Sequence, residues 1–465
     1  MREDATRSPL VSRRAVLGGA LAGAAIGLLP GTAEAAGRSM TRMKKPGPGT
    51  LPNPSAPPGT DQLPQVKNIV CVMMENHSYD NVLGMMQGRG DGFTIDGSGN
   101  PTASNPWPNS SVDPPPFKHA EVHAFPMPNP CQEPHQPFNT WEAAHVSFHG
   151  GKNDGFVKSQ SGPVSMGFVP PSVMPFTNSL AATFPVCDRY FCSVMAQTYP
   201  NRRYLMGGTS LGLIDDTLNN DKPPNGTIFE ALIAHGISWR NYYSSLPSLL
   251  IWTYLSSVPG VGANLVNISN FFTDAAAGTL PAFSLVDPDF GKQSEENPQD
   301  VQFGDQFLAQ VVNAVMASPQ WKDTLLVWCY DESGGYYDHV PPPKAVKPDS
   351  VAPVLAPTDH PGSFNRYGFR VPAGVVSPYA RPDYVSHVVH DHTSVLKLIE
   401  TKWNLPALTF RDLLADDLLD CVDLTSPPAF LTPPTLAAAL DPTLAEGCLT
   451  TGPGTIPPPA YVTAT

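Results

Sequence analysis

Short apolar runs alternate along the chain with segments whose apolar residues recur at helical spacing. The runs that predict buried strands are residues 69–74, 237–243, 282–287, 324–330 and 371–377. The segments that predict helices are residues 227–236, which Gly236 ends, 304–316 and 393–403. Strands that alternate with helices usually form a parallel sheet with helices on both faces. The pattern therefore predicts an α/β fold, a three-layer α/β/α sandwich around a mainly parallel sheet.

The N-terminus has the pattern of an export signal. Arg13 and Arg14 precede the apolar run 15–29, and residues 33–35 form a small-x-small cleavage site. We therefore predict that residues 1–36 are a signal for the twin-arginine export machinery. The mature protein is then secreted or extracytoplasmic and has no stable membrane span. A retained membrane anchor is the alternative, although the run is short for one.

Proline and glycine divide the rest of the chain. Residues 37–65 are rich in both and predict an extended linker, residues 66–424 predict the folded catalytic domain, and residues 425–465 predict a Pro-rich tail. Many of the 54 prolines lie in long loop insertions within the domain. Long irregular segments in compact domains often cover functional sites, so we expect residues 91–156 to lie over one.

Charge and cysteine content restrict the possible partners. The chain carries 28 Lys and Arg against 41 Asp and Glu, a net charge of −13. Because nucleic acid binds basic surfaces, a nucleic-acid partner is not expected. The seven cysteines of an exported chain allow disulfides. We interpret Cys71 and Cys329, which lie in apolar runs, as core residues, and we expect Cys421 to pair with Cys448.

Two of the predicted strands end in acidic pairs. Glu75 and Asn76 follow the run 69–74, and Asp331 and Glu332 follow the run 324–330. Ligands of open α/β sheets gather at the carboxyl ends of the strands, so we expect these side chains to meet. Three carboxylates and an amide oxygen repel one another unless a cation lies among them. Such an oxygen set suits a hard divalent ion, Ca²⁺, Mg²⁺ or Mn²⁺ rather than Zn²⁺. Each pair alone also fits a solvated turn.

Several motifs occur together in one order. They are "ENHSYDNVLG", "AQTYPNRRYLMGGTS", "DESGGYYDHV" and "GFRVPAGVVSPYARP" followed by "HTSVLKLIE". Over residues 66–415 the chain resembles the bacterial phosphoesterase family of phosphatidylcholine-type phospholipases C and acid phosphatases. That family is similar in fold to the alkaline phosphatase superfamily. The resemblance implies a metal-assisted phosphoryl-transfer site at the strand ends.

The resemblance also implies roles for particular residues. Glu75, Asn76, Asp331 and Glu332 are then the metal ligands. The hydroxyl of Thr198 is then the nucleophile and a further metal contact, because a cation makes a threonine hydroxyl reactive. In the same motif, Asn201 and Arg202 are expected to contact the substrate.

Two histidines and one departure from the family pattern complete the expected site. His135 and His339 match positions suited to binding phosphoryl oxygens or protonating the leaving group. Many relatives have a histidine before a proline where this chain has Asn297, which can donate a hydrogen bond but cannot carry a positive charge. His392 is expected to be structural, next to a helix cap at Asp391 or Thr393.

The sequence therefore predicts an exported, metal-dependent phosphoesterase. Its substrate is either a phospholipid, cleaved in the manner of a phospholipase C, or a phosphomonoester, cleaved in the manner of an acid phosphatase. Aromatic residues near the site either surround a choline group or belong to the core; they are Trp107, Trp141, Tyr336 and Tyr337. The alternatives are a carboxylester hydrolase that uses Ser210 in a G-x-S-x-G motif, and a non-catalytic binding protein with a structural calcium ion.

Overall fold

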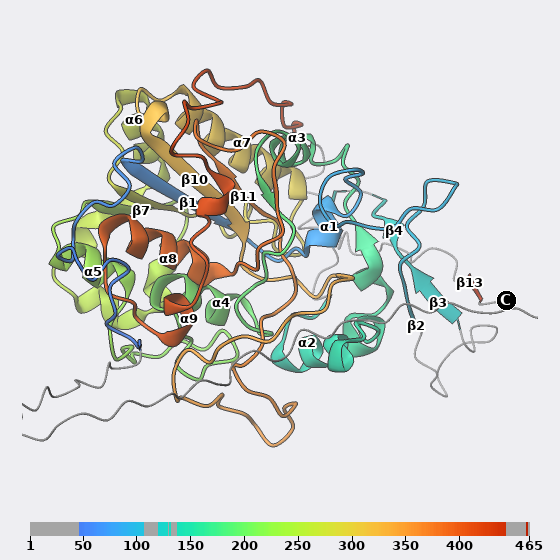
Figure 1. The fold of residues 1–465 in the computed structure, drawn as a ribbon. Coiled ribbons are helices and arrows are strands. Elements are labelled where there is room, and N and C mark those ends of the chain that lie inside the picture. The colour runs from blue at the N-terminus through green and yellow to red at the C-terminus, as the bar shows by residue number, and fades with distance from the viewer. Residues whose placement is uncertain (1–45, 107–119, 129, 132–136, 443–461, 464–465) are drawn as a thin grey trace, which may run out of the picture. The chain divides into compact units, whose positions relative to one another are not determined.

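A computed structural model describes residues 46–106, 120–128, 130–131, 137–442 and 462–463 (Figure 1). The chain divides into two units, residues 1–45 and 46–465. The predicted export signal lies outside the described residues, as do His135, Trp107 and Cys448. Among the described residues, every helix is too short or too polar to cross a lipid bilayer.

A central sheet with strand order β12-β6-β11-β10-β1-β9-β7-β8 forms the middle of the fold. Its strands, in chain order, are β1 (Asn68–Met74), β6 (Val186–Cys187), β7 (Trp239–Tyr243), β8 (Leu265–Asn267), β9 (Phe283–Val286), β10 (Thr324–Tyr330), β11 (Ala373–Val376) and β12 (Val385–Ser386). β1 lies between β10 and β9 and is parallel to both. All seven residues of β1 and of β10 are buried, as their apolar runs predict.

Helices cover both faces of this sheet (Figure 1). The helices are α1 (Tyr79–Leu83), α2 (Trp141–Phe148), α3 (Pro175–Thr183), α4 (Thr198–Gly207), α5 (Ile228–Ala234), α6 (Ile268–Ala277), α7 (Val301–Ala317), α8 (His392–Trp403) and α9 (Phe410–Leu413). α3, α6 and α7 lie on one side of the sheet, and α4, α5 and α8 lie on the other. The predicted three-layer α/β/α class is confirmed.

Local sequence signals explain where the predicted helices begin and end. A capping box between Thr227 and Glu230 starts α5, and Gly236 lies just beyond it with a φ of +65°. A second capping box, between Asp391 and Ser394, starts α8. The prediction that Asp391 caps this helix, with His392 in a structural position, agrees with the structure.

The sheet departs from the parallel pattern at β11, which is antiparallel to both β10 and β6. A parallel connection needs a crossover that returns the chain to the starting end of the sheet, and this is usually a helix. Residues 331–372 between β10 and β11 contain no helix. The chain therefore enters β11 from the opposite end.

Part of the expected linker is folded against the domain. Asn404 ends α8 in a left-handed conformation, and its amide donates to the carbonyls of Asn53 and Ala56 and accepts from the Asn53 backbone. The buried Lys402 donates to Asp61 and Leu63. The prediction of an extended linker is therefore wrong for residues 46–65. Composition alone missed these contacts because they depend on a helix more than 300 residues away in the chain.

The C-terminal side also differs from expectation. Residues 425–442 of the expected tail lie along the domain, where the Phe430 carbonyl accepts from the indole of Trp321. Cys421 is a buried free thiol whose Sγ lies 3.8 Å from that of Cys187, so the expected pairing with Cys448 is wrong. Proximity in sequence favoured that pair, whereas η8 (Leu419–Cys421) places Cys421 beside β6.

The Pro-rich insertion before α3 forms its own small elements. They are β2 (Ser104–Pro106), β3 (Ala120–His123), β4 (Phe125–Pro126) and β5 (Gly167–Phe168), and β13 (Val462–Thr463) pairs with β3. Most of these strands lie to one side of the central sheet (Figure 1). Within the described part of residues 91–156, the segment around Phe138 and Asn139 borders the strand ends, as described next.

Candidate active site

The two acidic strand ends lie side by side. β1 and β10 pair in parallel register with Met74 opposite Tyr330, so Glu75 and Asp331 leave the sheet together. The backbone N–H of Asn76 donates to Oδ1 of Asp331 at 3.1 Å, and the N–H of Asp331 donates to the Met74 carbonyl. The expected meeting of the two pairs at one edge of the sheet is therefore present.

Two unusual backbone conformations shape this edge. Asn76 has a φ of +69°, a left-handed conformation that asparagine tolerates better than most residues. Gly334, with a φ of +64°, packs so closely on Asn76 that a Cβ atom would lie 1.9 Å from the Asn76 carbonyl oxygen. Only glycine fits there. The "DESGG" sequence therefore allows the second strand end to close onto the first.

Glu332 is held at the same edge by hydrogen bonds from two directions. Its Oε2 accepts from the Gly334 N–H, and its Oε1 accepts from Nδ2 of Asn139, both at 2.7 Å. Asn139 belongs to the Pro-rich insertion and has no signal in the sequence that marks it as a site residue. Asn76, Asn139 and Asn297 line one cavity of about 310 Å³, and Oη of Tyr336 donates to Oδ1 of Asn297.

Thr198 is the first residue of α4, which places its hydroxyl at the helix N-terminus. Its Oγ1 donates to Oδ1 of Asn76 at 3.4 Å, and the residue is 7% exposed. The side chain of Asn201 donates to the backbone carbonyls of residues 194, 196 and 197 and accepts from the N–H of Val194. Asn201, expected to contact substrate, thus holds the turn that positions Thr198.

Arg202 lies one helical turn after Thr198 and faces the same carboxylates. Its Nε donates to Oδ2 of Asp331 at 2.9 Å, and its Nη2 lies 3.5 Å from Oε1 of Glu75. A longer contact of 4.0 Å joins its Nη1 to Oδ1 of Asp287. The guanidinium is buried, so in this structure it acts as counter-ion to the strand-end carboxylates.

Three further carboxylates lie at the site, and the sequence analysis did not select them. Asp287 follows β9 directly, which is the same signal of a carboxylate after a buried strand. Asp216 and Glu296 line a cavity of about 360 Å³ together with Glu75, Thr198 and Arg202. Both lie in loops, where no local pattern distinguishes them from ordinary surface acids.

Negative charge exceeds positive charge around this cavity. Burial, together with repulsion from Asp331, raises the pKa of Glu75 and of Glu332 well above the usual value, although Arg202 acts against this at Glu75. Loss of hydration in the cavity, with repulsion from Asp331, also raises the pKa of Asp216 to about 6 and that of Glu296 to about 7. The site is therefore suited to a cation.

Unpartnered oxygen atoms point to the same conclusion. Oε2 of Glu75 and Oδ1 of Asp287 are buried without a hydrogen-bond partner among the described residues. A buried carboxylate oxygen without a partner is costly, and a divalent ion would satisfy it. Among the expected ligands, Glu75 therefore offers a free oxygen for a hard ion, whereas both carboxylate oxygens of Asp331 and of Glu332 already accept hydrogen bonds. In this structure Nε of Arg202 donates a hydrogen bond to Asp331, and its Nη2 lies near Glu75.

His339 is held elsewhere, in a buried network around Arg370. Its Nδ1 lies 2.7 Å from Oδ2 of Asp80, and its Nε2 lies 3.2 Å from Oδ1 of Asp91. Burial lowers its pKa, but the Asp80 hydrogen bond and charge outweigh this and raise it to about 9. Within the described part of the chain, its hydrogen bonds connect it to neither Thr198 nor the strand-end carboxylates. The structure therefore does not bring His339 to the expected site.

His392 is buried and contacts the site from behind. One of its ring nitrogens, Nε2, lies 2.6 Å from the carbonyl oxygen of Asp331. The ring therefore holds the backbone at the end of β10 and supports the position of the Asp331 side chain. This structural role agrees with the sequence interpretation.

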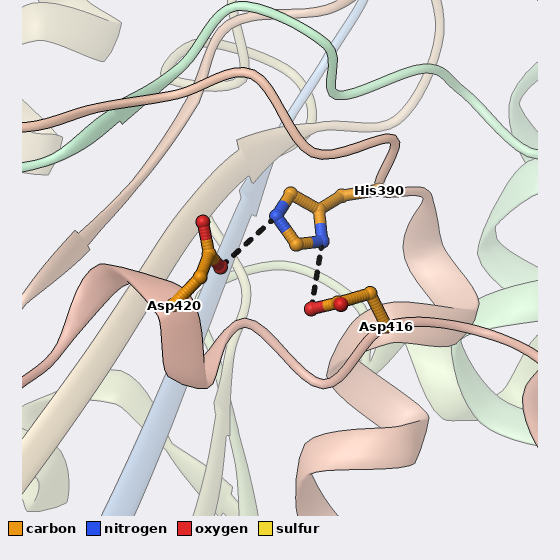
Figure 2. A group of neighbouring side chains, drawn as sticks. All are labelled: His390, Asp416 and Asp420. Atoms are coloured by element: carbon orange, nitrogen blue, oxygen red, sulfur yellow. Dashed lines mark ion pairs between the residues drawn. The ribbon is translucent and has the colours of Figure 1, made fainter.

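Another histidine, His390, lies between two carboxylates (Figure 2). Of the described residues, His390, Asp416 and Asp420 alone form a group of three such ligands within 4.8 Å of one another. Nε2 of His390 faces Asp420 at 3.3 Å, and Nδ1 faces Asp416 at 3.7 Å. The two carboxylates lie on different edges of the ring, so the cluster is interpreted as an ion-pair network that ties the loop before α8 to the segment around η8.

The expected aromatic residues are mostly core residues. Trp141 and Tyr336 are buried; Tyr336 stacks on His77, and Trp141 packs against His145. Tyr337 is half-buried against Phe156. The interpretation of these residues as core aromatics agrees with the structure.

Comparisons with known proteins identify the chain as a hydrolase acting on phosphoric esters. The chain belongs to the Phosphoesterase family, whose model matches residues 66–406. The resemblance inferred from the motifs is thereby confirmed.

Named relatives span most of the chain. Non-specific phospholipase C3 of Arabidopsis thaliana is 30% identical over 78% of this chain and 74% of its own length. Phospholipase C B of Mycobacterium tuberculosis is 30% identical over 80% of both chains. Among solved structures, a protein of the alkaline phosphatase superfamily from Vibrio parahaemolyticus matches 78% of this chain and 71% of its own, with 11% identity and a TM-score of 0.40.

Proposed function

We propose that this protein cleaves phospholipids in the manner of a phospholipase C, through a phosphothreonine intermediate at Thr198. The observation that supports this most strongly is the contact of the Thr198 hydroxyl with Asn76, beside two acidic strand ends, in a cavity with excess negative charge. The names of the relatives support the choice of phospholipid. Hydrolysis of phosphomonoesters is the other activity that the same chemistry permits.

Each residue has a defined task in this reaction. Oγ1 of Thr198 attacks phosphorus and releases its proton to water, and the bond from phosphorus to the leaving-group oxygen breaks as that oxygen gains a proton. The N-terminus of α4 offers partial positive charge to the phosphoryl oxygens. Asn201 and Asn76 keep the hydroxyl in place. Water then hydrolyses the phosphothreonine and restores the free hydroxyl.

Glu75, Asn76, Asp331 and Glu332 would hold a divalent ion of the Ca²⁺, Mg²⁺ or Mn²⁺ type. When bound, such an ion lowers the pKa of a neighbouring hydroxyl and neutralises charge on phosphoryl oxygens. The buried, unpartnered Oε2 of Glu75 supports this assignment. Metal analysis of the purified protein, before and after chelation, tests it directly.

Glu296 is the group best suited to protonate the leaving alcohol. It lines the cavity with Thr198, and its pKa of about 7 leaves it largely protonated at mildly acidic pH. The rate should therefore fall as pH rises through about 7. Glu296→Gln should abolish this fall in the pH–rate profile and lower the rate about 10²-fold. A variant that keeps the wild-type pH profile would assign the proton to another group.

The esterase alternative has little support. Ser210 is fully buried, and its hydroxyl has no hydrogen-bond partner among the described residues. A nucleophile elbow needs a strand before the serine and a helix after it. Here α4 precedes Ser210, and a turn follows.

One pair of assays decides between the remaining possibilities. The purified mature protein is given a phosphocholine diester and a phosphomonoester at equal concentration, with and without EDTA. We expect faster turnover of the diester and loss of both rates in EDTA. A faster monoester rate would favour the phosphatase, activity in EDTA would contradict the metal, and stabilisation by metal without any turnover would favour the binding protein.

We further propose that the twin-arginine machinery exports the protein and that cleavage follows residue 36. The supporting observation is the sequence pattern of residues 13–35. Replacing Arg13 and Arg14 together by lysine should retain the protein in the cytoplasm. N-terminal sequencing of the exported form identifies the cleavage site.

A further inference from the structure

Two exposed leucines stand at the mouth of the cavity that contains Thr198. Leu218 is 54% exposed and Leu246 is 67% exposed, and both line that cavity. Large apolar side chains with this exposure lose free energy in water unless a partner covers them. Their place beside the proposed nucleophile connects them to the substrate.

An apolar wall joins the leucines to the reacting end of the cavity. Pro247, Leu250, Ile251 and Phe290 line the same cavity as Thr198. The ring of Phe290 also carries the guanidinium of Arg202 at 5.0 Å from its centroid. One continuous surface therefore runs from the exposed leucines to Thr198 and Glu75.

The two loops that carry the leucines are anchored to the domain. Next to Leu218, the carbonyl of Thr217 accepts from the buried Arg203, and the carbonyl of Asn219 accepts from Oγ1 of Thr253 at 2.6 Å. Next to Leu246, the N–H of Ser248 donates to Oδ2 of Asp287 at 2.7 Å. The leucines are thus presented on fixed backbone and kept out of the core.

Charge around Leu218 selects the kind of partner. Asp215, Asp216 and Asp221 flank it, and Lys222 is paired with Glu230. Carboxylates repel an anionic lipid surface and attract the ammonium groups of a zwitterionic one.

We propose that Leu218 and Leu246 dock the protein on the surface of a zwitterionic lipid aggregate. The leucines enter the acyl region, and the surrounding carboxylates face the headgroup ammonium groups. Docking brings a lipid phosphate to the Thr198 cavity while its acyl chains follow the apolar wall. This inference rests on the proposed phospholipase function.

Vesicle co-sedimentation with the full mature protein tests the docking without relying on turnover. The probes are phosphatidylcholine vesicles and vesicles that contain phosphatidylglycerol. The variants are Leu218→Ser, Leu246→Ser and their combination. Leu414→Ser is the matched control, because Leu414 is 64% exposed but does not line the cavity.

We expect the wild type and Leu414→Ser to bind phosphatidylcholine vesicles equally. Each cavity-mouth variant should need about tenfold more lipid for half-maximal binding, and the double variant more than either. Binding to phosphatidylglycerol vesicles should be weaker, and added salt should reduce the difference. Thermal melts show whether each variant is folded. If the double variant is unfolded, the comparison of either single variant with the wild type still tests the docking.

A second readout separates failure of the docking from failure of the proposed function. The ratio of the rate on vesicles to the rate on a soluble phosphocholine ester should fall about tenfold or more in the double variant. Wild-type protein that fails to bind vesicles, or a double variant that binds as well as wild type, overturns the docking. Stronger binding to anionic vesicles, or a dimer in solution that the double variant abolishes, overturns the choice of partner. Leucine-dependent vesicle binding without turnover of any phosphoester keeps the docking and overturns the proposed function.

Discussion

Two buried arginines, Arg202 and Arg370, are each surrounded by carboxylates. The two clusters differ in how many of their carboxylate oxygens have a hydrogen-bond partner. Arg370 donates to Asp338 and Asp80 at 2.9 and 3.0 Å and to two backbone carbonyls. Both oxygens of Asp80 are used, since Oδ2 also accepts from the backbone and lies against the ring of His339. Around Arg202, Oε2 of Glu75 and Oδ1 of Asp287 have no hydrogen-bond partner among the described residues.

This difference is what the proposed ion site at the Arg202 cluster would produce. A buried charge cluster stabilises a fold only when every polar atom has a partner. The carboxylates of the Arg370 network meet this condition among the described residues, because none of the side-chain oxygens of Asp80 and Asp338 is unpartnered. Among the described residues the Arg202 cluster does not meet it, and under the proposed function a cation would complete it. The following predictions test this contrast.

The largest effect is expected at Thr198. Thr198→Val keeps the shape of the side chain but removes the hydroxyl, so kcat should fall by about 10³-fold or more while the melting temperature stays close to wild type. Thr401→Val, in α8, is the matched control and should keep its activity. An active Thr198→Val protein would contradict the proposed nucleophile.

Glu75→Gln should separate activity from stability. It removes a charge from the ion site, so phosphoesterase activity and metal affinity should both fall about 10²-fold. Because it also relieves repulsion from Asp331, the chelated variant should melt at the same temperature as chelated wild type or higher.

Asp80→Asn is the corresponding change in the Arg370 network. It should lower the melting temperature with or without metal, because it weakens ion pairs to Arg370 and His339. Thermal melts in EDTA and in excess metal compare the two variants. If Glu75→Gln responded to metal as wild type does, the metal-site assignment would be wrong.

Arg370→Met should destabilise the fold strongly. It leaves Asp80 and Asp338 buried without their counter-ion, and breaking such a cluster typically costs about 3–5 kcal/mol. Urea unfolding measures the loss, and Arg366→Met, a half-buried arginine, is the control. A loss below about 1 kcal/mol would show that the network is not structural.

The smallest effect is the pH dependence of stability from His339. Its folded pKa of about 9 exceeds the ordinary value of 6.5. The stabilisation is therefore complete below about pH 6.5 and is lost as pH rises towards 9. This should amount to about 2–3 kcal/mol of unfolding free energy. Unfolding curves between pH 6 and 9.5 should show this loss for wild type, and His339→Gln should show a flatter profile.

The sequence by itself determined the main strands and helices, and it placed the side chains at the ends of β1 and β10 next to one another. β1 and β10 are uniformly apolar, and parallel neighbours in a sheet end at the same edge, so Glu75 and Asp331 were predictable as neighbours. The boundaries of α5 and α8 followed from capping residues that act within one helical turn. All of these signals are local, or depend only on the alternation of strands and helices.

The tertiary structure decided which side chains complete each charge cluster. Arg202 meets Asp331 from 129 positions away in the chain, and His339 meets Asp80 from 259 positions away. No periodicity or spacing specifies such partners, because they depend on strand register and on how loops return across the sheet. Chemically similar groups then differ in their pairing: among the described residues, the carboxylates around Arg370 are fully hydrogen-bonded, whereas Glu75 and Asp287 around Arg202 are not.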